Sequence, residues 1–216
     1  MPPLPDILPV FPLTGAVLLP RGHLPLNIFE PRYLCMIDDA LGRGRIIGMV
    51  QPVEPQSGVP DDSGAPAVFE VGCAGRISQF EEAGDGRYLI TLTGLCRYRI
   101  RTEQACATPY RQMAVDYAPY LDDLAPARDV GEIDRRRLVA ALRIYFEIQG
   151  LSVDWAAIDA APFEALINSL AMMCPFEANE KQALLEAKTL ADRARVLDAL
   201  VEMAVAGAGG DDGALQ

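Results

Sequence analysis

Residues 11–20 read Phe-Pro-Leu-Thr-Gly-Ala-Val-Leu-Leu-Pro, and residues 24–33 read Leu-Pro-Leu-Asn-Ile-Phe-Glu-Pro-Arg-Tyr. Both segments are mainly apolar, and proline interrupts both of them. Because proline has no backbone N–H to donate to a neighbouring strand, such segments favour edge or irregular strands of a small closed β structure over the central strands of a parallel sheet. The pattern predicts short strands over residues 7–13, 16–19 and 24–28.

A helix is predicted to follow directly, over residues 31–41. Pro31 occupies the first helical position, where the N–H that proline lacks would have no intrahelical partner, and Glu30 takes the cap position before it. Gly42 is expected to end the helix. Helical spacing predicts a buried face made of Tyr33, Leu34, Ile37 and Leu41.

Composition divides the chain into two parts. The first is rich in glycine, proline and β-type runs, and the part after residue 131 is rich in alanine, leucine, glutamate and arginine at helical spacing. A chain of 216 residues, half of them hydrophobic, can bury two modest cores. We therefore predict a β part over residues 1–118, a helical part over 119–206 and a disordered tail over 207–216.

The remaining elements follow from periodicity and turn residues. Further strands are predicted over residues 45–50, 68–82, 87–93, 96–101 and 110–117, with a bulge at Gly94. Residues 54–66 are dense in proline, glycine, serine and aspartate, and we expect a mobile surface loop there. Helices are predicted over residues 132–149, 154–159 and 162–173. Two more are expected to begin at capping pairs, Asn179 with Gln182 and Thr189 with Asp192.

Charge and cysteine usage indicate the class of protein. The formal net charge is −11, so binding to nucleic acid would require a local basic patch that overcomes the repulsion of phosphates. The five cysteines are odd in number and scattered among apolar neighbours, which is typical of reduced, buried thiols. No apolar run is long enough to span a bilayer, and no positively charged region precedes the first apolar stretch. We expect a soluble, cytoplasmic protein without membrane contact.

The sequence offers little for catalysis. A hydrolase needs a nucleophile with a base in reach, and His23, the only histidine, is expected to be an ordinary loop residue. The acidic doublets have no spacing that resembles a metal site, and residues 42–45 contain two glycines but not the lysine of a P-loop. We predict no catalytic residue, no metal site and no cofactor.

One predicted strand has a basic face. Arg97, Arg99 and Arg101 alternate with Cys96, Tyr98 and Ile100, so the three arginines lie on one side. Guanidinium groups in a row can hold carboxylates or phosphates, which predicts a protein-binding surface. The alternative is that Arg97 pairs with an acidic residue of the same domain, such as Glu30, and that the others are solvated. No aromatic residues for base stacking are interleaved on this face, which weighs against RNA.

Five runs of this sequence resemble the signature of one family. They are residues 11–13, 17–20, 25–33, 94–100 and 180–187, and they look like the Lon protease N-terminal, or substrate-binding, domain family over residues 6–205. Packing explains most of the motif positions, and Glu30 with Arg32 is expected to form an ion pair at the start of the helix. The motif positions are Phe11, Pro12, Leu13, Phe29, Glu30, Pro31, Arg32, Tyr33 and Gly94.

The resemblance implies an α+β fold: a PUA-like β pseudo-barrel with one inserted helix, followed by a small α-helical bundle. It also implies recognition of unfolded or tagged polypeptides. The sequence contains no Walker motif and no protease domain. We therefore expect a stand-alone, non-enzymatic module that binds polypeptide segments or a protein partner in an apolar groove between its two parts, as an adaptor in protein quality control. RNA binding by a PUA-like domain is the alternative, and a hydrolase that uses His23 is a third hypothesis.

Overall fold

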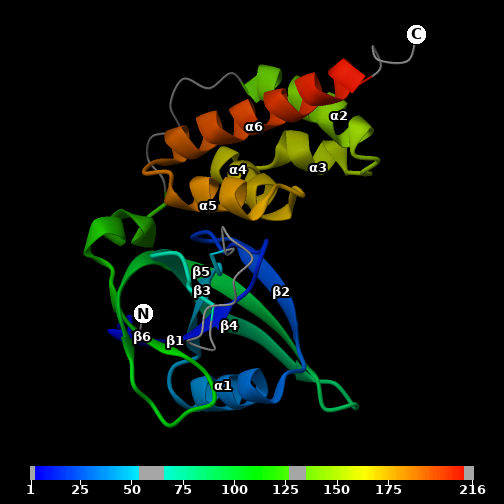
Figure 1. Ribbon diagram of the computed structural model, residues 1–216. Coiled ribbons are helices and arrows are strands. Elements are labelled where there is room, and N and C mark those ends of the chain that lie inside the picture. The colour runs from blue at the N-terminus through cyan, green and yellow to red at the C-terminus, as the bar shows by residue number, and fades with distance from the viewer. Residues whose placement is uncertain (1–2, 54–65, 127–134, 212–216) are drawn as a thin grey trace. The chain divides into compact units, whose positions relative to one another are not determined.

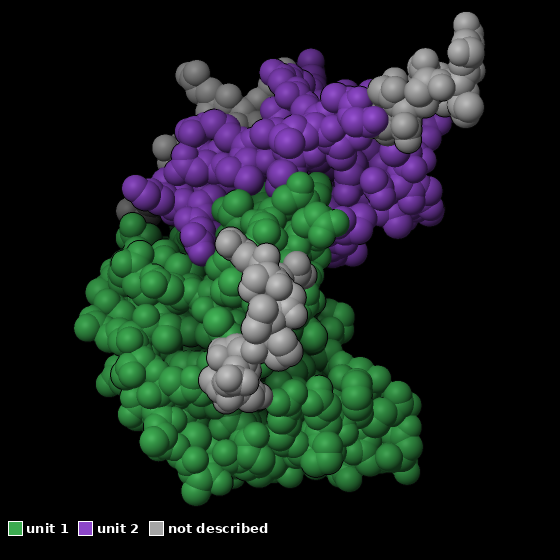
Figure 2. Space-filling view, in the orientation of Figure 1, with its two compact units in different colours: residues 1–126, 176–185 green, residues 127–175, 186–216 purple. Residues whose placement is uncertain are grey.

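The computed structural model describes residues 3–53, 66–126 and 135–211 of the chain. It divides into two compact units (Figure 2): residues 1–126 with 176–185 form unit 1, and residues 127–175 with 186–216 form unit 2. The loop expected over residues 54–66 lies, apart from Pro66, outside the described residues.

Unit 1 is built on one mixed sheet of six strands (Figure 1). The strands are β1 (Ile7–Pro12), β2 (His23–Ile28), β3 (Ile46–Val50), β4 (Val71–Glu82), β5 (Tyr88–Gln104) and β6 (Gln112–Asp116). Their order is β2-β5-β4-β3-β1-β6, and β5 also pairs with β6, so the sheet curls around its core as a pseudo-barrel. Only β1 and β3 pair in parallel. The expectation of a closed β structure was wrong, because β2 is an edge strand that pairs with β5 alone.

Two expected strands differ in the structure. Residues 16–19 form no strand, although Val17, Leu18 and Leu19 are buried, because the chain crosses β5 where Leu19 meets Gly94 instead of pairing along an edge. A Cβ atom at Gly94 would lie 2.0 Å from the carbonyl oxygen of Leu19, so only glycine permits this crossing. The runs predicted at 87–93 and 96–101 form one strand, β5, and the bulge expected at Gly94 is confirmed by a register shift where Gly94 faces Gly75.

Helix α1 (Pro31–Gly42) confirms the predicted start at Pro31. Glu30 has extended backbone angles and makes no side-chain cap bond. The buried face is displaced from the predicted one, since Leu34 and Leu41 are only half-buried. It consists of Tyr33, Met36, Ile37 and Ala40. In Figure 1, α1 covers one end of the curled sheet.

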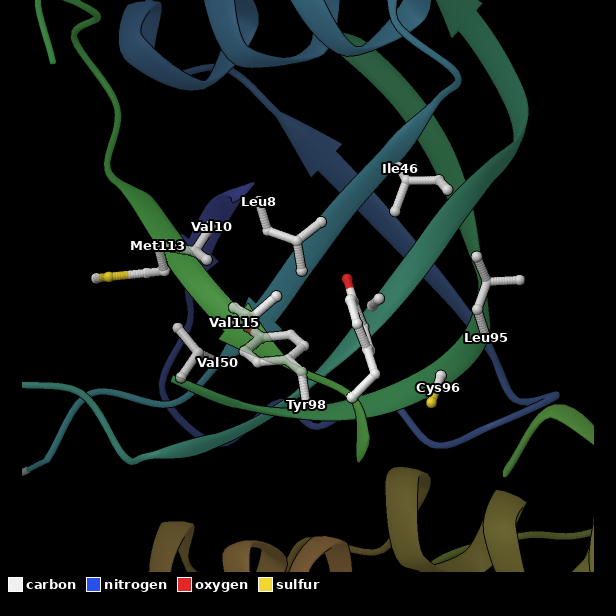
Figure 3. Packing of buried hydrophobic residues seen from close by; sticks show 11 residues of the cluster. Leu8, Val10, Ile46, Val50, Leu95, Cys96, Tyr98, Met113 and Val115 are labelled. Atoms are coloured by element: carbon white, nitrogen blue, oxygen red, sulfur yellow. The ribbon is translucent and has the colours of Figure 1, made fainter. Parts of the chain in front are cut away.

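The core of the pseudo-barrel is arranged around Tyr98 of β5, whose side chain is fully buried. Figure 3 shows the ring in the interior together with residues from β1, β3 and β6. Its hydroxyl donates a hydrogen bond to the carbonyl oxygen of Met49, 3.1 Å away. Cβ atoms at Gly48 and Gly72 would lie 2.6 and 2.4 Å from this hydroxyl oxygen. These two glycines therefore provide the space that the tyrosine occupies.

Unit 1 also contains two segments that the sequence assigned to the helical part. They are the short helix η1 (Ala118–Leu124) and all but the last residue of α5 (Ala178–Glu186). Buried Gln51 donates from Nε2 to the Ala178 carbonyl oxygen (2.9 Å) and to Gln182 Oε1 (3.1 Å). Lys181 Nζ donates to the Gly15 carbonyl oxygen over 2.8 Å. These bonds tie α5 to the sheet, so the predicted division after residue 118 does not match the boundaries of the two units.

The start of α5 also differs from the prediction. Asn179 lies inside the helix, and Gln182 is buried and bonded to Gln51 and to the carbonyl oxygen of Val71. The capping interaction is displaced towards the N-terminus, where the backbone N–H of Glu177 donates to Glu180 Oε2 over 2.8 Å. A carboxylate near the first turn serves this role as well as the predicted amide pair.

Unit 2 is helical in the described residues. It comprises α2 (Arg135–Ile148), α3 (Trp155–Ala160), α4 (Phe163–Met173) and α6 (Leu190–Asp211). The predicted capping pair at the start of α6 is confirmed, since Asp192 N–H donates to Thr189 Oγ1 (3.0 Å) and Thr189 N–H to Asp192 Oδ2 (3.2 Å). Helix α6 continues past Gly207 to Asp211, into the stretch expected to be disordered, and residues 212–216 lie outside the described part. None of the described helices is long and apolar enough to cross a membrane.

Candidate functional site

Several family-motif residues meet at one cavity of unit 1, which we call the motif pocket. It has a volume of about 270 Å³. Pro12 comes from the end of β1, and Arg32 and Tyr33 come from the first turn of α1. The pocket is lined by Pro12, Arg32, Tyr33, Pro52, Pro66, Pro109, Tyr110 and Arg111. Residues far apart in the sequence thus form a single wall.

Tyr33 is a buried polar side chain of the motif pocket, with 6% of its surface exposed. Its ring packs against Phe11, with ring centroids 4.4 Å apart, and the Arg32 guanidinium lies 4.5 Å from the ring centre. Burial raises the pKa of the Tyr33 hydroxyl, and the charges of Arg32 and Arg111 oppose this effect. The hydroxyl therefore stays protonated at neutral pH, and it has no hydrogen-bond partner among the described residues.

The two arginines of the motif pocket are each held by a carboxylate. Arg32 donates from Nε to Glu30 Oε2 over 2.9 Å, which confirms the ion pair expected at the helix start. Arg111 donates to Glu103 through Nε (2.9 Å) and Nη2 (2.7 Å), and its Nη1 donates to the carbonyl oxygen of Pro66 (2.7 Å). The hydrogen bond from Arg111 lowers the pKa of Glu103. The pairing fixes both guanidinium groups in position.

Tyr110 joins the two sides of the pocket. Its hydroxyl donates to Asp39 Oδ2 of α1 over 2.5 Å. Burial and this hydrogen bond raise the pKa of Tyr110 well above its usual value. The segment before β6 is therefore attached to the same helix that supplies Arg32 and Tyr33.

The other motif residues have mixed roles. Phe11 and Gly94 are packing residues, as expected. Phe29 is different, because 65% of its surface is exposed although packing was expected to explain it. Leu13 is half-buried, and its N–H donates to the Val50 carbonyl oxygen over 3.0 Å. An exposed aromatic residue directly before α1 is thus a second candidate for binding.

The structure places the three arginines of β5 in different environments. Arg97 is only 4% exposed, and its Nε and Nη2 donate to the carboxylate of Asp123 over 2.8 and 2.9 Å. The pairing interpretation therefore holds for Arg97, with Asp123 in place of Glu30. Arg101 is exposed and donates to Asp116 Oδ2 over 2.8 Å, and Arg99 is exposed. A binding role for Arg99 and Arg101 stays a prediction.

His23 begins β2 and does not lie in the loop expected for it. Its Nδ1 is 3.0 Å from Thr93 Oγ1, and Thr93 in turn contacts Ser78 Oγ over 3.0 Å. Ser78 donates its own hydroxyl proton to the carbonyl oxygen of Thr91, so it must accept from Thr93, and His23 must then donate to Thr93. This proton order is the reverse of what an activated serine needs. No group of three or more His, Cys, Asp or Glu side chains suited to a metal was found in the described part of the chain.

Sequence reasoning missed five of the eight residues that line the motif pocket. Tyr110 and Arg111 were placed at the start of a strand predicted over residues 110–117, and β6 begins only at Gln112. Pro66 is the last residue of the segment that was expected to be a mobile loop, and Pro52 comes shortly before that segment. The one available signal was the Pro109-Tyr110-Arg111 triplet itself, which combines rigid, aromatic and cationic groups.

The sequence is similar to part of known Lon proteases. The family model described as "ATP-dependent protease La (LON) substrate-binding domain" matches residues 7–202. Lon protease 2 of Sorangium cellulosum is 28% identical over 213 residues, which covers 93% of this chain and 25% of that protein. Lon protease 2 of Myxococcus xanthus is 30% identical over 113 residues, or 52% of this chain and 13% of that protein. The chain thus spans a quarter or less of the length of these relatives.

Solved structures agree on the fold. A Lon N-terminal domain protein from Xanthomonas campestris matches with a TM-score of 0.60 and 22% identity, covering 89% of this chain and 97% of that one. The N-terminal domain of a Mycobacterium avium complex Lon protease matches with a TM-score of 0.59 and 16% identity, covering 91% and 98% of the two chains. Since the family model covers nearly the whole sequence, this chain belongs to the family of the Lon protease substrate-binding domain.

Proposed function

We propose that this protein binds segments of non-native polypeptide through the surface formed by the motif pocket and Phe29. The observation that carries the proposal is that positions of the family signature line a pocket and leave an aromatic side chain exposed beside α1. The protein acts by binding and not by catalysis, in the cytoplasm, and serves as an adaptor that presents polypeptides in protein quality control. The name of the matching family model supports substrate recognition.

The physical basis is the burial of apolar surface. Folded proteins hide their apolar side chains, whereas unfolded ones offer them to any exposed aromatic group. Covering a side chain such as Phe29, which is 65% exposed, contributes about 1–2 kcal/mol, the corresponding share of the value for complete burial. Such contacts tolerate many sequences, which suits a module that recognises the non-native state.

The test is a binding titration with one protein in two states. Fluorescein-labelled α-lactalbumin is used natively folded, and also reduced and carbamidomethylated so that it cannot refold. We expect saturable anisotropy changes with the unfolded form only. Equal binding of both forms, or of neither, would contradict the proposal.

Two variants locate the contact. Phe29→Ser is expected to weaken binding of the unfolded form about tenfold, because an exposed aromatic contact is lost. Met173→Ser is the matched control, since Met173 of α4 is also apolar and is 81% exposed. An equal effect of both variants would show that binding is unspecific adhesion to exposed apolar groups. A salt series with mixed RNA tests the alternative ligand, because phosphate binding must weaken steeply as salt rises.

A further inference from the structure

The lining of the motif pocket divides into an apolar half and a hydrogen-bond-donating half. Four prolines supply the apolar half, and none of them has a backbone N–H. The side-chain polar groups are those of Arg32, Arg111, Tyr33 and Tyr110, and no aspartate or glutamate is among the described residues that line the pocket. This is notable in a chain with 30 acidic residues against 19 basic ones. The pocket is therefore locally different from the acidic protein around it.

Donors remain available after the internal pairs are formed. A guanidinium group carries five N–H donors, and the bonds from Arg32 to Glu30 engage only its Nε and Nη2. The Tyr33 hydroxyl is a further donor without a partner in the described part of unit 1, although only 6% of the residue is exposed. It is accessible from the pocket, since it is not among the fully buried polar atoms that lack a partner, and a ligand can accept its hydrogen bond.

The charges of both arginines act inside the pocket. Arg32 and Arg111 each lower the pKa of the Tyr33 phenol, against the larger effect of burial, because their charges lie near it; the Arg32 guanidinium is 4.5 Å from the ring centre, and Arg111 lines the same pocket. The complementary ligand group is an anion that accepts several hydrogen bonds in one plane, and carboxylate matches guanidinium geometry in this way.

The volume of the motif pocket limits the size of the ligand. Sites for small-molecule ligands usually measure about 300–1,000 Å³, and the motif pocket, at about 270 Å³, lies below that range. It accommodates a single residue. The side chain of an internal aspartate or glutamate brings a carboxylate but little apolar surface for the prolines. A C-terminal residue brings both, because its backbone carries the carboxylate and its side chain is free to be apolar.

We propose that the motif pocket binds the C-terminal residue of a polypeptide, whose carboxylate accepts hydrogen bonds from Arg32, Arg111 and Tyr33 while its apolar side chain lies against the prolines. This inference rests on the proposed function and adds to it the part of the polypeptide that is recognised. Charge-assisted bonds to the terminal carboxylate give affinity, and the proline wall selects against charged terminal residues.

The experiment compares three octapeptides labelled with fluorescein at the N-terminus. The first is Gly-Ser-Gly-Ser-Gly-Ser-Ala-Phe with a free C-terminus, the second is its C-terminal amide, and the third is an amide in which glutamate replaces the alanine. We expect the free acid to bind at least about tenfold more tightly than either amide, because both amides lack the terminal carboxylate and the glutamate of the third peptide carries its carboxylate on a different residue from the apolar side chain. Equal affinities for all three, or binding of the glutamate amide as tight as that of the free acid, would overturn the proposal.

The Tyr33→Phe variant removes one hydroxyl and leaves the ring that packs on Phe11 in place. The variant is expected to bind the free-acid peptide about threefold to tenfold more weakly than the wild type does, and to bind the amide peptide with unchanged affinity. Tyr88→Phe is the matched control, since it removes an exposed hydroxyl that donates to Asp38 and not to the pocket. An equal loss of affinity for the free-acid peptide in both variants would contradict the role of the Tyr33 hydroxyl in binding the carboxylate.

The outcomes separate this inference from the proposed function. Binding of unfolded α-lactalbumin together with equal affinity for acid and amide peptides overturns the inference alone. Failure to bind unfolded α-lactalbumin as well as the peptides overturns both.

Discussion

The ion pair between Arg97 and Asp123 is predicted to be the most consequential polar contact of unit 1. The two side chains are 5% and 10% exposed, and Arg97 also donates from Nη1 to the Leu185 carbonyl oxygen over 3.1 Å. It therefore joins β5 to η1 and to α5. Replacing Arg97 by methionine leaves the carboxylate of Asp123 buried and largely unpaired. The expected loss in the free energy of unfolding is about 3–5 kcal/mol.

A double-mutant cycle separates the pair from its surroundings. Asp123→Leu alone is expected to lose a similar amount, because it leaves the guanidinium buried without its counter-ion. The double variant Arg97→Met with Asp123→Leu removes both charges. Its loss is expected to be at least about 2 kcal/mol smaller than the sum of the single losses. The exposed pair Arg101 and Asp116 is the control, and the corresponding Arg101→Met variant should lose no more than about 1 kcal/mol.

The assay must read unit 1 alone. Urea titration followed by amide hydrogen exchange of peptides from β4 and β5 does so, whereas fluorescence of Trp155, the only tryptophan, reports on unit 2. Strictly additive losses in the cycle, or equal losses for Arg97→Met and Arg101→Met, would refute the reasoning that burial makes this pair important.

Three further predictions concern stability and reactivity. Gly94→Ala should destabilise unit 1 by at least about 1–3 kcal/mol because its Cβ would meet a backbone carbonyl at 2.0 Å, whereas Gly84→Ala meets open space and should be neutral by urea denaturation. Burial raises the pKa of Cys96 to about 12, so at pH 8 a thiol reagent should label exposed Cys106 in the native protein and Cys96 only after unfolding; early labelling of Cys96 would contradict this. The pKa of Glu103 is lowered in the folded protein, so its ionised carboxylate contributes to the free energy of unfolding at neutral pH. This contribution is lost as the pH falls through the folded-state pKa. The stability difference between wild type and Glu103→Gln, at most about 1 kcal/mol at pH 7, should therefore vanish in acid.

The elements of the fold follow closely from local sequence signals. Pro31 at a helix start, the Thr189 and Asp192 capping pair, and the strict alternation around Tyr98 each act over a few residues, so periodicity and capping rules identify them. The assignment of elements to units does not follow from such signals. Helix α5 has ordinary helical periodicity, and bonds to distant residues, such as those to Gln51 and Gly15 more than a hundred positions away, place it in unit 1.

The candidate site was predictable only in part for the same reason. The family signature identified Arg32 and Tyr33 but not their surroundings, because Tyr110 and Arg111 approach them through the pairing of β1 with β6. The exposure of Phe29 was missed because an aromatic residue between a strand and a helix is usually buried. The surroundings of Arg32 and Tyr33 and the exposure of Phe29 both depend on how distant segments pair and pack. Sequence periodicity carries no information about such long-range pairing.

The account depends most on where a polypeptide binds. Amide hydrogen exchange of the protein, measured with and without reduced, carbamidomethylated α-lactalbumin, addresses this directly. The account predicts slower exchange in residues 29–34 and 108–112, which carry Phe29 and most of the polar wall of the motif pocket. Unchanged exchange in both segments, with protection confined to other parts of the chain, would contradict it.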